Sequence, residues 1–112
     1  LQDVQELHNH VEKVRLDESL MEYLLAIVAA TRRSDLLALG VSTRGAMALH
    51  KAAKALALVR GRDYCLPDDI KELAPIVLSH RVMLAANQGG RGRFEEAQQI
   101  IRDLVESVPV PL

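Results

Sequence analysis

Hydrophobic and polar residues alternate along this 112-residue chain with the helical period of three to four residues. The first apolar series predicts a helix from Asp3 to about Lys13 and consists of Val4, Leu7, Val11 and Val14. A second series predicts a helix that runs to about Arg33 and consists of Leu20, Leu24, Ile27 and Val28. Asp17 is the expected N-cap of this second helix, because its carboxylate can accept the free N–H groups of the next turn.

Three further helices are predicted by the same periodicity. One spans Thr43 to Arg60, with Ser42 or Thr43 as its cap, Gly61 just after its end, and an inner face of Ala46, Leu49, Ala53, Leu56 and Ala57. Another begins near Pro67, where Asp68 and Asp69 complement the helix dipole, although Pro75 should kink it or shift its start. The last begins at Phe94 and directs Ala97, Ile100, Ile101, Leu104 and Val105 inward.

The segments between the helices are short and partly apolar. Residues 34–42 form a connection that we expect to lie against the body, because Leu36, Leu37 and Leu39 are too apolar for a free loop. Residues 80–84 are expected to be extended, as is the tail from Val108 to Pro111. We predict an all-α domain, a compact bundle of about five helices, with one very short pairing between residues 14–16 and 64–66.

Composition narrows the class of protein. Lys and Arg number 14 against 15 Asp and Glu, for a net charge of −1, which argues against general nucleic-acid binding. The apolar run from Tyr23 to Ala30 is too short for insertion into a membrane, and no secretory signal is visible, so we expect a cytoplasmic protein. The single cysteine, Cys65, excludes an intrachain disulfide. The chain starts with Leu1, so residues 1–112 are expected to be one domain cut from a longer protein.

The most informative stretch is Gly40-Val41-Ser42-Thr43-Arg44, which leads directly into the alanine-rich helix. A helix start carries unpaired N–H groups and partial positive charge, and a guanidinium adds a fork of donors suited to phosphate. We therefore interpret Arg44 as an anion sensor, with Ser42 and Thr43 beside it. The sequence contains no phosphate-cradling G-x-x-x-x-G-K-[ST] loop, so no catalytic residue is assigned in this chain.

Other polar residues suggest structural roles. Arg32 and Arg62 are expected to brace the body through hydrogen bonds, Arg62 with one of the nearby aspartates. Lys51 and Lys54 are expected on a solvated face, and Cys65 as a small buried hydrophobe. The four histidines lack zinc-like spacing, so we predict no metal site. The stretch 89–93, Gly-Gly-Arg-Gly-Arg, is interpreted as a connecting loop rather than a basic contact to RNA or a membrane surface.

Six short motifs, in order, resemble the C-terminal lid domain of AAA+ ATPases of the MoxR family. They are Ala30-Thr31-Arg32, Leu39 to Arg44, Gly61-Arg62-Asp63-Tyr64, Pro67-Asp68-Asp69-Ile70, His80-Arg81-Val82 and Val108 to Pro111. The resemblance implies a helical lid that closes on ATP and Mg²⁺ held by a separate core domain. It also implies chaperone-like rings, contacts with neighbouring subunits, and partners that carry von Willebrand factor A domains.

Within this resemblance, Arg44 corresponds to the sensor-2 arginine, which contacts ATP near its γ-phosphate. The family usually has proline and alanine where this chain has Thr43 and Gly45. Thr43 does not fix φ as proline does, and Gly45 weakens a helix, so both changes predict a less rigid sensor turn. Leu66 replaces a capping threonine, which predicts a poorly satisfied helix start.

Two other readings stay open at the level of sequence. The first is a free-standing helical module that binds a partner protein without contacting nucleotide. The second, a DNA-binding helix-turn-helix, is weaker because the helix from Thr43 is mostly alanine and leucine.

Overall fold

The computed structural model describes residues 2–85 and 93–111, which form five α-helices. These are α1 (Gln2–Lys13), α2 (Glu18–Arg33), α3 (Thr43–Val59), α4 (Pro67–Leu78) and α5 (Arg93–Ser107). A 3₁₀ turn, η1 (Ser79–Arg81), follows α4, and two short strands are present, β1 (Leu37–Leu39) and β2 (Met83–Leu84). The predicted all-α bundle of about five helices is confirmed.

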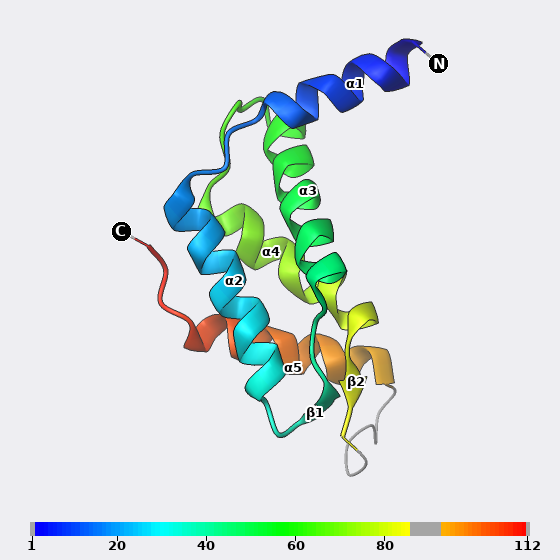
Figure 1. The fold of residues 1–112 in the computed structure, drawn as a ribbon, viewed down its shortest axis with the longest axis vertical. Coiled ribbons are helices and arrows are strands. Elements are labelled where there is room, and N and C mark those ends of the chain that lie inside the picture. The colour runs from blue at the N-terminus through cyan, green and yellow to red at the C-terminus, as the bar shows by residue number, and fades with distance from the viewer. Residues whose placement is uncertain (1, 86–92, 112) are drawn as a thin grey trace.

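Helices α2 to α5 enclose the core, whereas α1 projects from one end of the body beside the end of α3 (Figure 1). The most extensive packing joins α3 to α4 and α4 to α5. Leu49, Ala53 and Ala57 of α3 are fully buried, as the apolar pattern predicted. Leu56 and Leu104, also predicted to face inward, are only half-buried.

The caps of α2 and α3 differ from each other. Asp17 is the N-cap of α2, but its carboxylate makes no capping bond and instead accepts a hydrogen bond from Ser19 Oγ at 2.8 Å. The predicted role of that carboxylate is therefore wrong. In α3 the cap is Ser42, and Gly61 follows the end of the helix with φ of 79°, a conformation that favours glycine.

Helix α4 begins at Pro67, as predicted, and continues through the buried Pro75. Leu66 in the N-cap position offers no side-chain acceptor, but its own N–H donates to Asp69 Oδ2 at 2.8 Å. This bond is the return half of a capping box, in which an acidic residue in the first turn reaches back to the cap. The helix start is thus better satisfied than Leu66 alone predicts.

Two extended pairings tie the helices together. The predicted pairing of residues 14–16 with 64–66 is present as a single parallel bridge between Arg15 and Tyr64. An antiparallel pair, β1 with β2, was not predicted and places Leu37 opposite Leu84. Leu37 is buried, but Leu36 and Leu39 are exposed, so the expectation that all three lie against the body is wrong. Residues 80 and 81 belong to η1 and are not extended.

Candidate functional site

The candidate site is the first turn of α3. Ser42 has extended backbone angles and its Oγ accepts a hydrogen bond from Gly45 N at 3.3 Å. Its carbonyl accepts another from Ala46 N at 3.0 Å. Arg44 follows inside the turn with an exposed side chain, and Thr43 beside it is also exposed. The cap therefore fixes the backbone and leaves the Arg44 side chain in solvent.

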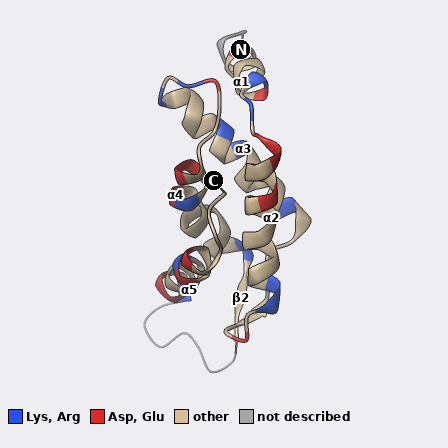
Figure 2. Ribbon diagram, turned by 90° about the vertical axis from the view of Figure 1, so that its left-hand side faces the viewer, with Lys and Arg blue, Asp and Glu red and all other residues tan. Residues whose placement is uncertain are grey.

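The charge of this helix start is unlike that of its neighbours. The first turns of α2, α4 and α5 carry carboxylates, namely Glu18, Asp68 with Asp69, and Glu95 with Glu96 (Figure 2). The first turn of α3 has no acidic residue, and it contains Arg44 instead. A cation at a helix N-terminus is mildly unfavourable, so this turn gains stability when an anion approaches it.

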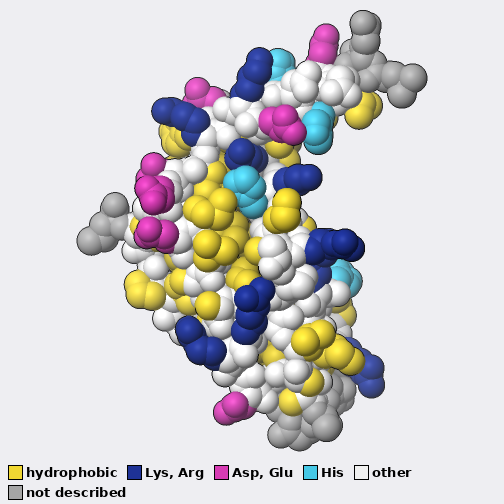
Figure 3. Space-filling view, viewed as in Figure 1, with side chains coloured by type: hydrophobic (Ala, Val, Ile, Leu, Met, Phe, Trp, Pro, Cys, Tyr) yellow, Lys and Arg dark blue, Asp and Glu magenta, His cyan; other side chains and the backbone are white. Residues whose placement is uncertain are grey.

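Arg44 makes no hydrogen bond or ion pair with any residue in the described ranges 2–85 and 93–111. In Figure 3 several acidic side chains gather along the left side, towards α2, while basic side chains are spread over the whole face. The arginine that the sequence singled out is available to a ligand from outside the domain.

The turn before Arg44 is held by the end of α2. Thr31 Oγ1 accepts a hydrogen bond from Val41 N at 3.0 Å and donates one to Val28 O at 2.6 Å. Arg32 Nε donates to Val41 O at 2.8 Å. Both polar backbone atoms of Val41 are therefore engaged by adjacent residues of α2. Thr31 and Val41 are each 1% exposed.

Gly40 allows this close approach between the loop and α2. A methyl group on Gly40 would lie 2.7 Å from Arg32 Cα and 2.8 Å from Arg32 N, distances that real side chains do not reach. Because both atoms belong to the helix backbone, neither can move aside cheaply. Glycine is therefore required here by contact, rather than only as a flexible point in a connection.

Gly45 has a comparable role on the other side of the turn. A methyl group there would lie 2.6 Å from Val41 Cγ1 and 3.1 Å from Arg81 Cδ. The absent side chain makes room for the Val41 side chain and the stem of Arg81. The sequence predicted that Gly45 loosens the sensor turn, but in the structure this glycine permits tight packing around it.

Arg62 braces the body, as predicted. Its two Nη atoms donate to the two carboxylate oxygens of Asp69 at 2.8 and 2.7 Å, and Arg60 Nη1 lies 3.5 Å from Asp69 Oδ1. Burial alone would raise the pKa of Asp69, which is 0% exposed. The bonds from Arg62 and Leu66 N and the nearby arginine charges outweigh burial, so this pKa lies below its ordinary value.

The remaining candidates take ordinary positions. Cys65 is buried, and burial raises the pKa of its thiol, as expected for a small core residue rather than a nucleophile. Lys51 is exposed and Lys54 half-buried. The described residues include no cluster of three potential metal ligands and no helix long and apolar enough to span a bilayer. Of the basic stretch 89–93, only Arg93 lies within the described residues, where it begins α5.

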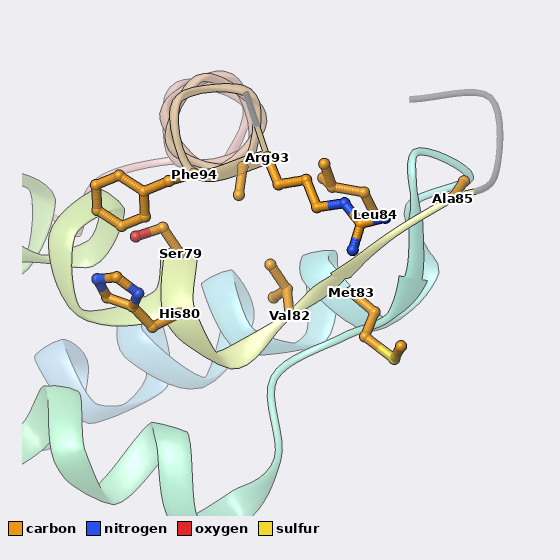
Figure 4. Close-up of a pocket in the computed structure, with 9 residues that line it drawn as sticks. Ser79, His80, Val82, Met83, Leu84, Ala85, Arg93 and Phe94 are labelled. Atoms are coloured by element: carbon orange, nitrogen blue, oxygen red, sulfur yellow. The ribbon is translucent and has the colours of Figure 1, made fainter. Parts of the chain in front are cut away.

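A separate pocket lies between η1, β2 and the start of α5 (Figure 4). His80 and Phe94 stack there with ring centroids 4.3 Å apart. Ser79 also lines the pocket, but its Oγ donates to Ile76 O in the last turn of α4 at 3.2 Å. The Ser79 hydroxyl is thus engaged by backbone, and these residues show no nucleophile–base pair.

Sequence reasoning selected Arg44 as a candidate and correctly predicted Ser42 as a possible cap, but it did not predict which residues hold this turn. Thr31 and Arg32 were recognised as part of a short motif, and Gly40 as a flexible point. The contacts of all three with the sensor turn were not predicted. Their spacing of about ten residues gives no periodic signal, because a loop brings them together.

Residues 29–104 match the family model described as AAA lid domain. The chain belongs to this family. A lid domain of the MoxR type, which the ordered motifs predicted, is confirmed by relatives with that name. The chain is 41% identical over 75 residues to "Chaperone MoxR1" of Mycobacterium tuberculosis and 45% identical over 108 residues to the uncharacterized protein YeaC of Bacillus subtilis.

A solved structure of a proposed ATPase from Cytophaga hutchinsonii superposes on the lid with a TM-score of 0.86 and 34% identity. The match covers 99% of the lid but 36% of that chain. The lid likewise spans 32% of the Bacillus protein and 20% of the Mycobacterium protein. The similarity to these proteins thus concerns about a third of their length or less.

Proposed function

We propose that this lid closes over ATP and Mg²⁺ held by a core domain of the same full-length protein, and that Arg44 is its sensor-2 arginine. The observation that carries the proposal is the exposed Arg44 in a helix start without any carboxylate. Membership of the AAA lid family supplies the context in which a phosphate is the expected anion.

The residues at the start of α3 suit the phosphate groups of ATP. ATP bound by the core supplies the anionic phosphate oxygens, and its hydrolysis removes the outermost group. Arg44 donates from a planar guanidinium, which suits the geometry of phosphate, and the helix dipole adds to the attraction. The exposed Thr43 hydroxyl is placed to add a hydrogen bond, and Ser42 contributes by capping the turn.

Arg44 in this arrangement favours the closed lid only as long as its acceptor is present. A ligand shifts an equilibrium between two states by its differential affinity for them. Loss of the contact therefore releases the lid and couples turnover to a change in its orientation. The lid has no phosphate-cradling loop of its own, so the ATPase activity belongs to the full-length protein and not to this domain.

We also propose how the full-length protein assembles with other subunits and with a partner. The lid contacts its own core domain and neighbouring subunits in a cytoplasmic, chaperone-like ring, and a protein with a von Willebrand factor A domain is its partner. Support comes from the ordered motifs and from the chaperone name of the Mycobacterium relative.

The decisive experiment replaces Arg44 with alanine in the full-length protein. Arg44→Ala is expected to lower ATP turnover at least tenfold, as removal of charge stabilisation at a reacting phosphate does. The thermal midpoint should change little, because the side chain is exposed. Steady-state ATP hydrolysis and thermal unfolding measure the two effects.

Arg102→Ala is the matched control, because Arg102 is an exposed arginine on α5, and its turnover should equal that of wild type. If Arg44→Ala also hydrolyses ATP at the wild-type rate, the sensor proposal fails. The helical interaction module without nucleotide contact then becomes the better reading.

A further inference from the structure

We propose that Thr31 and Arg32 are positioning residues for Arg44, which act by holding Val41 at the entrance to α3. This inference rests on the proposed function, since it assigns the two residues a part in presenting the sensor arginine. Three motifs that lie apart in the sequence, around residues 31, 41 and 81, then form one unit around the sensor turn.

The geometry leaves Val41 little freedom. Its N–H donates to Thr31 Oγ1 and its carbonyl accepts from Arg32 Nε, so rotation of either adjoining peptide breaks a hydrogen bond. Val41 is almost fully buried, and an unpaired polar backbone atom there carries the cost of desolvation. Arg44 is three positions after Val41, so a change in the peptide planes of Val41 redirects the helix start.

Steric contacts restrict the loop in the direction opposite to the hydrogen bonds. The backbone of Gly40 lies against the backbone of α2, and the Val41 side chain fits beneath Gly45. The loop therefore cannot shift towards α2, and its hydrogen bonds oppose movement away. This fixed position replaces the rigidity that a proline at position 43 would supply.

The test uses Thr31→Val and Thr31→Ser in the full-length protein. Valine matches threonine in shape but removes both the acceptor for Val41 N and the donor to Val28 O, whereas serine keeps the hydroxyl. Thr31→Val is expected to lower ATP turnover about 10- to 100-fold, since a displacement near 1 Å at a reacting group has effects of this size. Thr31→Ser should restore most of the activity.

A double variant separates positioning from general destabilisation. In the Arg44→Ala background, Thr31→Val should change turnover less than about twofold, because the side chain that it positions is gone. Ile101→Val is the matched control: it trims a fully buried residue of α5, lowers the thermal midpoint, and should leave turnover unchanged.

Each outcome separates the two proposals. If Arg44→Ala has no effect, the sensor function itself is wrong. If Arg44→Ala lowers turnover but Thr31→Val does not, or if the two effects multiply, the sensor stands and the positioning role is refuted. Loss of turnover in Ile101→Val to the same extent as in Thr31→Val also refutes the positioning role.

Discussion

Single residues in this lid act through close contacts that their chemical type alone does not reveal. Gly40 is an ordinary loop residue by sequence, yet its backbone touches the backbone of α2 at Arg32. Gly61, in contrast, has open space around it and is required for its positive φ. Two glycines thus serve for different physical reasons, contact in one case and conformation in the other.

Gly40→Ala is expected to lower the free energy of unfolding by about 1–3 kcal/mol, because a methyl group overpacks the junction with α2. It should also accelerate amide hydrogen exchange at Val41, whose N–H bond to Thr31 depends on this approach. Urea unfolding and hydrogen exchange measure the two effects.

Gly61→Ala is the control for this prediction. Gly61→Ala is expected to lower the free energy of unfolding by about 1 kcal/mol because of backbone strain. Amide hydrogen exchange at Val41 should not change. Equal exchange rates at Val41 in wild type and Gly40→Ala would contradict the contact argument.

The buried carboxylate of Asp69 makes the free energy of unfolding of the lid depend on pH. Its pKa lies below the ordinary value in the folded state, so its stabilising contribution is complete above the unfolded pKa near 4. This contribution is lost as the pH falls from about 4 through the folded pKa. Asp69→Asn is expected to lower the free energy of unfolding by about 2 kcal/mol at pH 6. This difference from wild type should shrink below pH 4.

Asp68→Asn is the matched control, because Asp68 is exposed in the same helical turn. Asp68→Asn should lower the free energy of unfolding by less than about 1 kcal/mol, which is the usual contribution of a charge at a helix end. Unfolding free energies of both variants over this pH range give the comparison. A pH-independent cost of Asp69→Asn would show that the carboxylate charge is not responsible.

Helices were predicted well from the sequence because their signals are local. The periodic apolar face and Gly61 located α3 to within one residue of its observed end, and Ser42 and Thr43 were the two candidates for its start. Strands β1 and β2 were not recognised as a pair, since they have three and two residues and lie more than 40 positions apart. Such pairing depends on how α2 and α4 pack, which no local pattern encodes.

Ser42→Ala tests the start of α3 as an element. Loss of the bond from Gly45 N to Ser42 Oγ is expected to cost about 1 kcal/mol of stability, the usual effect of removing a cap. Thr43→Ala, the adjacent exposed residue, should change stability by less than about 0.5 kcal/mol. Chemical denaturation of the two variants decides which residue is the cap, and an equal loss in both would contradict the structure.

At the scale of the whole molecule, the sequence singled out the exposed Arg44 as a candidate but gave no indication of the residues that hold the turn before it. Arg44 was chosen because a guanidinium at a helix start is an unusual charge arrangement that the sequence displays directly. Its attachment to Thr31, Arg32 and Gly40 arises only after α2 and the loop have folded together.

The lid alone is expected neither to hydrolyse ATP nor to bind it with a measurable affinity up to about 1 mM, because a single exposed ion pair contributes at most about 1 kcal/mol. Isothermal titration with ATP and Mg²⁺ measures this, with the full-length protein as the positive control. Saturable micromolar binding by the isolated lid would place a complete nucleotide site within it.

The stem of Arg81 fills the space beside Gly45, so the turn that follows α4 interlocks with the first turn of α3. Within the described residues, this contact joins the start of α3 directly to the end of α4. In the proposed function, a pull on the Arg44 guanidinium would therefore reach the end of α4 through Arg81. The change in orientation that we propose for the lid would then take place at its junction with the core domain.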